Sequence, residues 1–367
     1  KSSSGYHVAV IGAGVAGLAA ARDLALEGHK VIVYEKHSRP GGMMVQGIPS
    51  FRLPRDVVEH EINQVLSLGV ELKCGVSIGN DYSLDTLVDS HDAVVLAAGT
   101  LNGNRLDIPG GNLAGVEHGL EFLMMVNEQG RKHIGSNVVV IGGGYTAMDC
   151  ARTAIRLGAE TAVYYRRGPQ DMVVLPGEVQ ELLNETGAMN YFKTPSQFRG
   201  GESIQQVSLA KTRIDMEGGK SIIRIDTGSS TDIDVDSVIL ATGQTADTDW
   251  ISGHIREAIL NEQGDVSIAQ GALTPDPKVF VAGDFATGAT TLIDAIAHGR
   301  KTASLVTRFL TGQDISSRKV QIEKKRYGVD FEGGRFLRTQ EMNVIPITPV
   351  PALDLVDRQG SKEVELG

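Results

Sequence analysis

Residues 8–35 read VAVIGAGVAGLAAARDLALEGHKVIVYE, and this stretch decides the fold. Two apolar runs, at 8–11 and 31–34, lie on either side of a glycine-rich turn and a segment of small residues. An apolar run bounded by glycine predicts a buried parallel strand, and the small residues predict a helix that packs closely on a sheet. The stretch therefore predicts a strand, a tight turn, a helix and a second strand, in that order.

The turn carries Gly12, Gly14 and Gly17 in the pattern G-x-G-x-x-G, and the second apolar run ends at Glu35 and Lys36. In a dinucleotide-binding turn the first glycine permits the turn, the second lets a pyrophosphate approach the backbone, and the third lets helix and strand pack closely. An acidic residue at the end of the second strand accepts hydrogen bonds from ribose hydroxyls. A glycine-rich turn without a ligand is the alternative, and the two strands, the helix and Glu35 together favour the dinucleotide site.

The same unit recurs 130 positions later, where residues 138–167 read VVVIGGGYTAMDCARTAIRLGAETAVYYRR. Here Gly142, Gly144 and Ala147 form G-x-G-x-x-A between an expected strand at 138–141 and a helix. A second strand is expected at 161–165. The chain is therefore predicted to contain two dinucleotide-binding units.

The two units end in differently charged residues. The first ends in Glu35-Lys36, whereas the second ends in Arg166-Arg167. A carboxylate accepts a hydrogen bond from a free ribose 2′-hydroxyl and repels a 2′-phosphate, whereas arginine attracts the phosphate. The sequence thus predicts one site for a dinucleotide with a free ribose and one for NADP. Two solvated surface arginines without a ligand are the alternative for the second site.

Further strands are expected to complete both halves. Residues 92–100 (DAVVLAAGT) and 236–244 (DSVILATGQ) are near-copies, and each ends one half with an apolar run and a glycine. Residues 279–284 (VFVAGD) precede a helix expected within 287–306. Asp284, at the end of that strand, either accepts hydrogen bonds from the hydroxyls of a cofactor or caps the helix.

Length and composition exclude several other classes. At 367 residues the chain is long enough for two domains. Its 45 acidic and 35 basic side chains leave a net charge of −10, and only 5% of its residues are aromatic, which argues against a nucleic-acid or anionic-membrane partner. No apolar run approaches the roughly 18 residues that a membrane span needs. We expect a soluble protein of a reducing, cytoplasmic compartment.

Side chains for catalysis or metal binding are not grouped in the sequence. Cys74 and Cys150 form neither a CxxC motif nor a ligand set for zinc or an iron–sulfur cluster. The nine histidines include no HExxH motif. We therefore predict no metal site and no catalytic acid, base or nucleophile. Cys150 is expected to be a packing residue on a helix, and Cys74 a strand residue.

The order of these elements resembles the two-dinucleotide-binding flavoprotein superfamily. Within it, residues 41–62 (GGMMVQGIPSFRLPRDVVEHEI), 142–151 (GGGYTAMDCA) and 164–172 (YYRRGPQDM) resemble the NADPH–FAD part of the glutamate synthase small chain. They resemble equally the corresponding part of dihydropyrimidine dehydrogenase. Tyr145 stands where these families usually carry aspartate, and this chain has no counterpart of their cysteine-rich iron–sulfur segments.

The resemblance implies an α/β fold with two Rossmann-like domains, FAD on the first and NADPH on the second. It implies an FAD-binding domain formed by residues 1–105 and 274–315, with an NADP-binding domain inserted at 106–273. Residues 316–367, where prolines punctuate a segment without a persistent helix or strand period, are expected to be a C-terminal extension or linker. The two ends of the chain fit a piece of a longer polypeptide.

The resemblance also implies roles for particular residues, all of them in cofactor binding. The residues expected around FAD are Gly12, Gly14, Gly17, Glu35, Lys36, Gly42, Met43, Arg52, Gly99, Asp284 and Thr291. The residues expected around NADPH are Gly142, Gly144, Thr146, Arg166, Arg167 and Gly243. Arg52 would neutralise pyrophosphate charge, Asp284 and Thr291 would contact the ribityl chain and the flavin, and Gly243 would lie near the nicotinamide.

These observations predict an oxidoreductase module in which NADPH reduces FAD. Electrons would then pass to an iron–sulfur protein or a flanking iron–sulfur domain within a larger complex. One alternative is a stand-alone reductase of ferredoxin or another acceptor, and the absent CxxC argues against the thioredoxin-reductase kind. A second alternative is a module of a larger complex that binds nucleotides only structurally.

Overall fold

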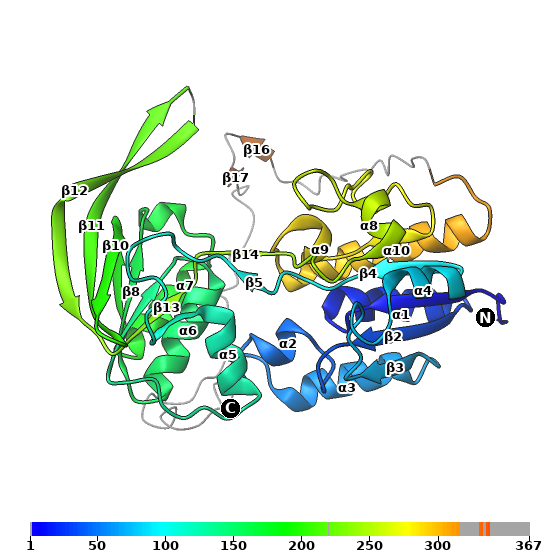
Figure 1. The fold of residues 1–367 in the computed structure, drawn as a ribbon, viewed down its shortest axis with the longest axis horizontal. Helices are drawn as coiled ribbons and strands as arrows, with labels where there is room; N and C mark the ends of the chain where they lie inside the picture. The colour runs from blue at the N-terminus through cyan, green and yellow to red at the C-terminus, as the bar shows by residue number, and fades with distance from the viewer. Residues whose placement is uncertain (1, 219, 316–329, 333–334, 338–367) are drawn as a thin grey trace.

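The computed structural model describes residues 2–218, 220–315, 330–332 and 335–337. They form two bodies that lie side by side, each built on a five-stranded sheet whose strands are all parallel (Figure 1). The predicted α/β fold with two Rossmann-like units is thereby confirmed. Below, the first and second bodies are those that contain the first and second glycine-rich turns.

The first sheet has the order β15-β4-β1-β2-β3. Its strands are β1 (His7–Ile11), β2 (Lys30–Glu35), β3 (Glu71–Cys74), β4 (Ala93–Leu96) and β15 (Val279–Val281). Successive side chains of a strand point to opposite faces, so Val8 and Val10 face one core while Ala9 and Ile11 face the other. One face is covered by α1 (Val15–Leu26), α3 (Arg55–Leu66) and α10 (Leu292–Leu310), and the other by α4 (Leu84–Ser90) and α8 (Gly253–Ile259). The short helices α2 (Met43–Gln46) and α9 (Asp284–Thr287) lie at the end of this sheet that faces the second body (Figure 1).

The second sheet has the order β6-β13-β7-β8-β9. Its strands are β6 (Val116–His118), β7 (Asn137–Ile141), β8 (Glu160–Tyr165), β9 (Ala188–Tyr191) and β13 (Ser237–Leu240). Helices α5 (Gly119–Asn127), α6 (Tyr145–Arg156) and α7 (Pro176–Asn184) pack on one face. A three-stranded antiparallel sheet of β10 (Lys193–Gly200), β11 (Ile204–Glu217) and β12 (Lys220–Asp234) packs on the other. Cys150 is buried in the core beneath α6, as expected of a packing residue.

The two sheets match strand for strand, with β7, β8, β9 and β13 in the places of β1, β2, β3 and β4. The acidic residues seen in the two near-copied stretches have equivalent contacts. Asp92 Oδ2 accepts a hydrogen bond from His7 N at 2.8 Å, and Asp236 Oδ2 accepts one from Asn137 N at 2.9 Å. Each carboxylate therefore ties the start of its own strand to the start of the neighbouring central strand.

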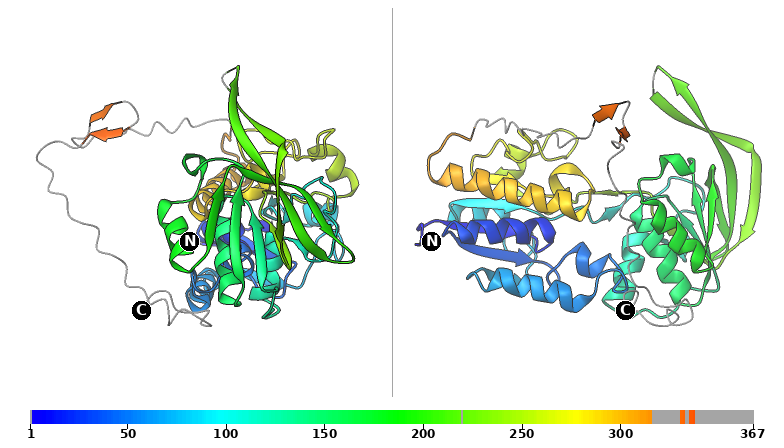
Figure 2. Two further views of the ribbon diagram at one scale, coloured as in Figure 1. Left: turned by 90° about the vertical axis from the view of Figure 1, so that its left-hand side faces the viewer. Right: turned by 180° about the vertical axis from the view of Figure 1, so that it is seen from behind.

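The antiparallel sheet was not predicted from the sequence. Beyond Lys211, β11 pairs only with β12, so residues 212–218 and 220–225 form a two-stranded ribbon that extends past the end of β10 (Figure 2). The C-terminal extension lies mostly outside the described residues. Within it, β16 (Asp330–Glu332) and β17 (Arg335–Leu337) pair antiparallel, where the sequence analysis expected no strand.

The crossing between the bodies differs from the expected domain boundary. Strands β5 (Asn102–Gly103) and β14 (Gln244–Thr245) run between the bodies and pair antiparallel (Figure 1). The sequence analysis placed the return at residue 274, but Ile251, Ile255 and Ile259 already pack in the core of the first sheet. We therefore propose that the inserted domain ends near residue 244. No helix within the described ranges is long and apolar enough to span a membrane.

Candidate functional site

A cavity of about 840 Å³ opens at the carboxyl ends of β1, β2, β4 and β15. Here the chain leaves the middle of the sheet toward both edges, and open α/β sheets bind ligands at such a switch point. Helix α5 and the N-terminus of α6 close the cavity from the second body. The predicted site residues that line it are Gly12, Gly14, Glu35, Lys36, Gly42, Met43, Arg52, Gly99, Thr146, Asp284 and Thr291.

Gly12 and Gly17 build the first glycine turn. Gly12 has φ 103°, and a Cβ there would lie 2.4 Å from Ala97 O. A Cβ at Gly17 would lie 2.0 Å from Gly12 O. Only glycine fits both positions, so the turn can press α1 against the strands. Gly17 does not line the cavity, and its contribution is to this packing.

Unlike Gly12 and Gly17, Gly14 is not crowded by the backbone, because its α-carbon faces open space. A Cβ built there would meet no protein atom nearer than Gly42 Cα at 4.0 Å. Gly14 is the N-cap of α1, no side chain caps this helix, and its first turn holds no acidic residue. The free N–H groups and the positive end of the helix dipole therefore face the cavity. This arrangement fits the pyrophosphate of FAD.

Glu35 is buried at the end of β2 and joins the turn to the cavity wall. Its Oε2 accepts a hydrogen bond from Ala13 N at 2.8 Å, and its Oε1 accepts one from His37 N at 2.8 Å. Each carboxylate oxygen has capacity for more than one hydrogen bond. The geometry leaves Glu35 able to accept from the hydroxyls of a ribose, as the sequence analysis predicted.

Asp284 and Thr291 lie on the opposite wall. Asp284 Oδ1 accepts hydrogen bonds from Thr290 N at 3.1 Å and Thr290 Oγ1 at 2.7 Å. Burial raises the pKa of Asp284, and the bonds from Thr290 oppose this rise. Thr291 is the N-cap of α10, since its Oγ1 accepts from Asp294 N at 3.2 Å. The cap of this helix is thus Thr291 rather than Asp284, and Asp284, which lines the cavity, uses only Oδ1 for its bonds to Thr290.

The second glycine turn has the same geometry as the first. A Cβ at Gly142 would lie 2.3 Å from Ala241 O, whereas Gly144 has no atom within 4 Å of its Cβ position. Helix α6 begins after Gly144 without a side-chain cap and without an acidic residue in its first turn. Thr146, in this turn, lines the cavity. The N-terminus of α6 therefore offers an anion site that lies beside the cavity of the first body.

The strand register corrects one equivalence drawn from the sequence. Gly12 N donates to Tyr34 O at 2.8 Å, and Gly142 N donates to Tyr164 O at 3.0 Å. Tyr165, and not Arg166, therefore occupies the place of Glu35. The misalignment arose because the sequence analysis matched the units by charge. The neutral Tyr165 still leaves no carboxylate to repel a 2′-phosphate.

Arg166 and Arg167 follow Tyr165 at the same edge of the sheet as the glycine turn. Arg166 is exposed, Arg167 is half-buried, and neither guanidinium has a partner among the described residues. Two unpaired cations beside a helix N-terminus fit a phosphate group. Neither lines the cavity, and Gly243 lies outside it as well, where its carbonyl accepts from Asn104 N at 3.0 Å beside the crossing strands.

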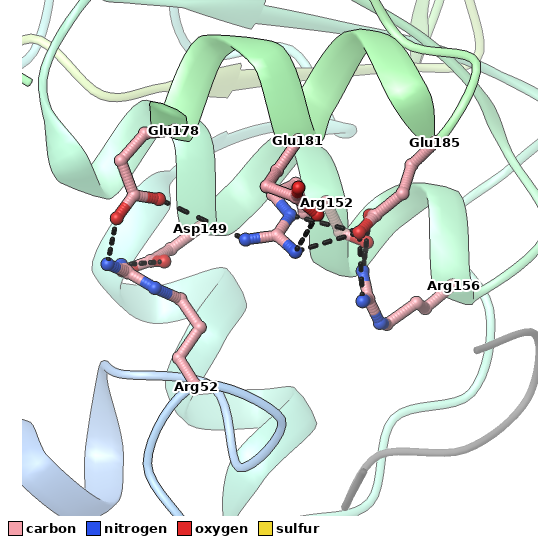
Figure 3. A network of polar contacts seen from close by, with 7 residues as sticks. All are labelled: Arg52, Asp149, Arg152, Arg156, Glu178, Glu181 and Glu185. Carbon is pink, nitrogen blue, oxygen red and sulfur yellow. Dashed lines mark hydrogen bonds and ion pairs between the residues drawn. The ribbon is translucent and has the colours of Figure 1, made fainter. Parts of the chain in front are cut away.

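Arg52 has partners that the sequence analysis did not expect. Its Nη1 lies 2.6 Å from Asp149 Oδ1 on α6, and its Nη2 lies 2.5 Å from Glu178 Oε1 on α7 (Figure 3). The sequence analysis assigned Arg52 to the pyrophosphate charge of FAD. In the structure the guanidinium is engaged by these two carboxylates of the second body, so that assignment stays a prediction without geometric support.

Sequence reasoning missed Asp149 and assigned no role to Tyr145. Asp149 is buried, lines the cavity and is the partner of Arg52. A lone carboxylate within the small, apolar residues of GGGYTAMDCA was the signal that could have revealed it. The ring of Tyr145 lines the cavity 5.9 Å from the Arg52 guanidinium carbon. Gln244 on the second crossing strand, and Asp247 and Trp250 just after it, also line the cavity, and the sequence analysis gave none of them a role.

Two glycine turns that open on or beside one cavity define a class, the FAD-dependent NAD(P)H oxidoreductases. The chain belongs to the pyridine nucleotide-disulphide oxidoreductase family, whose model matches residues 6–299. This membership confirms the predicted enzyme class and the two cofactors, FAD and NADPH.

Two named relatives are identical to this chain at about a third of the aligned positions. It is 34% identical over 317 residues to the beta subunit of an NADP(+)-dependent formate dehydrogenase from Moorella thermoacetica, covering 84% of this chain and 44% of that subunit. It is 33% identical over 331 residues to the glutamate synthase [NADPH] small chain of Escherichia coli (strain K12), covering 84% of this chain and 69% of that one. The predicted resemblance to the glutamate synthase small chain is thereby confirmed.

A solved structure supports the fold. FprA from Mycobacterium tuberculosis, determined in complex with NADPH, superimposes with a TM-score of 0.74 at 17% identity. The match covers 84% of this chain and 85% of FprA. At that identity the likeness speaks for the fold alone.

Proposed function

We propose that this chain oxidises NADPH, transfers the hydride to FAD bound on the first body, and passes the electrons to an iron–sulfur centre on a partner or on a flanking domain. The observation that carries the proposal is that Gly14 and Thr146, from the two glycine turns, line the same cavity. A nicotinamide held by the second body would then lie close to a flavin held by the first. No further site would be needed between the two cofactors.

FAD, when bound, accepts the hydride of NADPH and releases its two electrons one at a time to an acceptor. The chain's own residues bind and orient the cofactors. The N-termini of α1 and α6, both free of acidic residues in the first turn, favour the phosphate groups. Leu120 and Leu123 of α5 cover part of the cavity with apolar side chains, which helps exclude water from the transfer. Under this proposal no side chain acts as an acid or base.

The position of the cysteines favours an acceptor outside residues 2–315. Cys74 ends β3 in the first body, whereas Cys150 is buried on α6 in the second. Burial also raises the pKa of Cys150 well above its ordinary value, which disfavours the reactive thiolate. The two thiols are therefore poorly placed to act as a redox disulfide. The cytoplasmic location expected from the sequence belongs to this proposal as well.

The names of the relatives also favour a partner. One relative is named as the beta subunit of a formate dehydrogenase and another as the small chain of a glutamate synthase. Since this chain spans less than half of the first and about two thirds of the second, it corresponds to a part of each. We infer that the terminal acceptor is set by a partner or flanking segment rather than by this module.

The acceptor proposal is tested with the FAD-loaded chain, NADPH and three acceptors: ferricyanide, an added [4Fe–4S] ferredoxin and a small disulfide. We expect reduction of ferricyanide and ferredoxin and no reduction of the disulfide. Reduction of the small disulfide by the chain alone would favour a self-contained reductase. Failure to reduce even ferricyanide would favour a module that binds nucleotides without turnover.

A further inference from the structure

The two bodies are joined covalently by a narrow connection. Within residues 2–218 and 220–315 the chain crosses between them at β5 and β14, which pair over two residues each. Asn104 N donates to Gly243 O at 3.0 Å and extends this pairing by one bond. Gln244 of β14 adds two long side-chain bonds, since its Oε1 accepts from Thr100 Oγ1 at 3.3 Å and its Nε2 donates to Thr146 Oγ1 at 3.4 Å. Because an isolated two-stranded ribbon is only marginally stable, these few bonds fix the connection weakly. The orientation of the second body therefore depends on contacts elsewhere.

One such contact is made by the loop between α2 and α3. Arg55 fixes this loop within the first body, since its Nη1 donates to Met44 O at 2.5 Å and its Nη2 donates to Ile48 O at 2.8 Å. The tip of the loop, Phe51 and Arg52, is thereby presented to the second body. Phe51 is buried there, although it belongs to a loop.

The tip of the loop contacts two helices of the second body. The Arg52 guanidinium bridges Asp149 on α6 and Glu178 on α7, at 2.6 and 2.5 Å. The Phe51 ring lies 5.1 Å from the Arg152 guanidinium carbon and 3.7 Å from that of Arg156. Figure 3 shows Arg52 reaching from its loop to the carboxylates that line this side of the helices.

The charges near Arg52 make it hard to replace. Burial raises the pKa of Asp149 to about 6, and Arg52 is the largest opposing influence. Arg152 cannot take over, because its guanidinium binds Glu185 at 2.8 Å and lies 3.9 Å from Glu178. Without Arg52, Asp149 and Glu178 would keep only the more distant charge of Arg152 in a poorly solvated place. The contact therefore depends on this one cation.

The contact acts close to the nucleotide site. Thr146, which lines the cavity, and Asp149, which binds Arg52, are three positions apart and so lie on one side of the first turns of α6. Fixing Asp149 fixes the helix terminus that faces the cavity. A small rotation about β5 and β14 would move Thr146 relative to the first body.

We propose that Phe51 and Arg52 form an interdomain latch that holds the N-terminus of α6 in register with the FAD cavity and so sets the hydride-transfer distance. Arg52, Asp149 and Glu178 are positioning residues in this view, since they act through α6 rather than on a cofactor atom. The inference rests on the proposed function for its kinetic consequence. Its geometric consequence, a fixed orientation of the two bodies, does not.

The test compares Arg52→Gln with a matched control, Arg131→Gln. Arg131 lies within the second body, its ion pair with Glu117 is also 2.6 Å long, and its side chain is 24% exposed against 22% for Arg52. In the FAD-loaded proteins we would measure FAD content, NADPH affinity, the single-turnover rate of flavin bleaching by NADPH, and the interdomain distance distribution by small-angle X-ray scattering. Asp149→Asn and the double variant Arg52→Gln/Asp149→Asn complete the set.

We expect Arg52→Gln to retain FAD and NADPH affinity within about twofold, but to slow flavin bleaching at saturating NADPH by at least about tenfold, since small misplacements of reactants carry large rate costs. Its distance distribution should broaden. The double variant should be no slower than the slower single variant, because both remove one contact. Arg131→Gln should behave as the wild type in all four measurements.

Two results would overturn the latch. If Arg52→Gln keeps the wild-type bleaching rate and distance distribution, the contact is only structural. If it loses FAD, Arg52 binds the cofactor as the sequence analysis first suggested. Failure of the proposed function looks different, because the wild type itself would then show no bleaching by NADPH while the scattering comparison still reports on the latch.

Discussion

Arg52 Nη1 lies 2.6 Å from Asp149 Oδ1, although the two residues are 97 positions apart and belong to different bodies. The pair joins the loop after α2 to the first turns of the helix that follows the second glycine turn. Burial favours the neutral form of Asp149, but Arg52 and Asp149 hold each other in the charged form. The geometry of this pair therefore links protonation, domain orientation and the nucleotide site.

Acidification should raise the stability of the wild type relative to that of Asp149→Asn. The pKa of Asp149 is about 6, raised mainly by burial from an ordinary value of 3.8. Between these values the folded protein binds the proton more tightly than the unfolded chain does, so folding is favoured as the pH falls. Relative to Asp149→Asn, the wild type should gain roughly 1 kcal/mol of stability between pH 7 and pH 5. Thermal unfolding of both proteins at pH 5, 6 and 7 measures this difference.

The sign of that difference is the critical outcome. Using the neutral Asn variant as the reference removes the contribution of the other carboxylates, which change equally in both proteins. A wild type that loses stability relative to Asp149→Asn on acidification would show that the ion pair with Arg52 outweighs burial and holds the pKa of Asp149 below its ordinary value.

Valine at Gly14 should abolish FAD binding without unfolding the chain. The Cβ position of Gly14 faces open space in the cavity, so the new side chain would occupy the volume that the pyrophosphate needs. Valine at Gly144, the equivalent position of the second turn, should leave FAD content unchanged and weaken NADPH binding. The purified proteins are compared by bound flavin after denaturation and by NADPH titration.

Replacing Gly12 by alanine should have a different effect from valine at Gly14 or Gly144. At Gly12 the added Cβ would lie 2.4 Å from Ala97 O at a φ of 103°, so we expect loss of stability as well as of FAD. If Gly14→Val retains stoichiometric FAD, the pyrophosphate does not bind at this turn, and the assignment of FAD to the first body is wrong.

Removal of both Arg166 and Arg167 should reduce the preference for NADPH. Alanine at the two positions should raise the KM for NADPH by about tenfold to hundredfold, the effect of losing charge-assisted bonds to a phosphate, and leave the KM for NADH nearly unchanged. Steady-state dye reduction with both nucleotides measures the effect. Arg213→Ala, which removes an exposed arginine of the β11–β12 ribbon, is the control. Equal use of NADPH and NADH by the wild type would contradict the assignment.

The sequence allowed the parallel sheets and the glycine turns to be predicted, because those features depend on local patterns. Val8–Ile11 and Val138–Ile141 are continuous apolar runs, and the positive φ of Gly12 and Gly142 is a local requirement. The cavity-lining residues Glu35 and Asp284 were found for the same reason, since each directly follows or ends a predicted strand.

The remaining features depend on contacts between distant segments. Asp149, the partner of Arg52, lies 97 positions away along the chain. The residues around Arg52 in the sequence do not indicate whether its guanidinium binds a carboxylate or a phosphate. In the second unit the position equivalent to Glu35 is occupied by Tyr165. Hydrogen bonds at the glycine turns set the register of the strands, and the charge of the side chains does not. We propose the return to the first body near residue 244 because α8 packs on the first sheet although it follows the second in sequence, and a local pattern does not reveal such packing.

Anaerobic mixing of the FAD-loaded protein with NADPH shows whether NADPH reduces FAD directly within this chain. In a single turnover without any acceptor, we expect complete bleaching of the flavin absorbance, with one NADPH consumed per FAD. NADH at the same concentration should bleach the flavin much more slowly. If NADPH binds tightly and the flavin stays oxidised, this chain does not transfer hydride from NADPH to FAD.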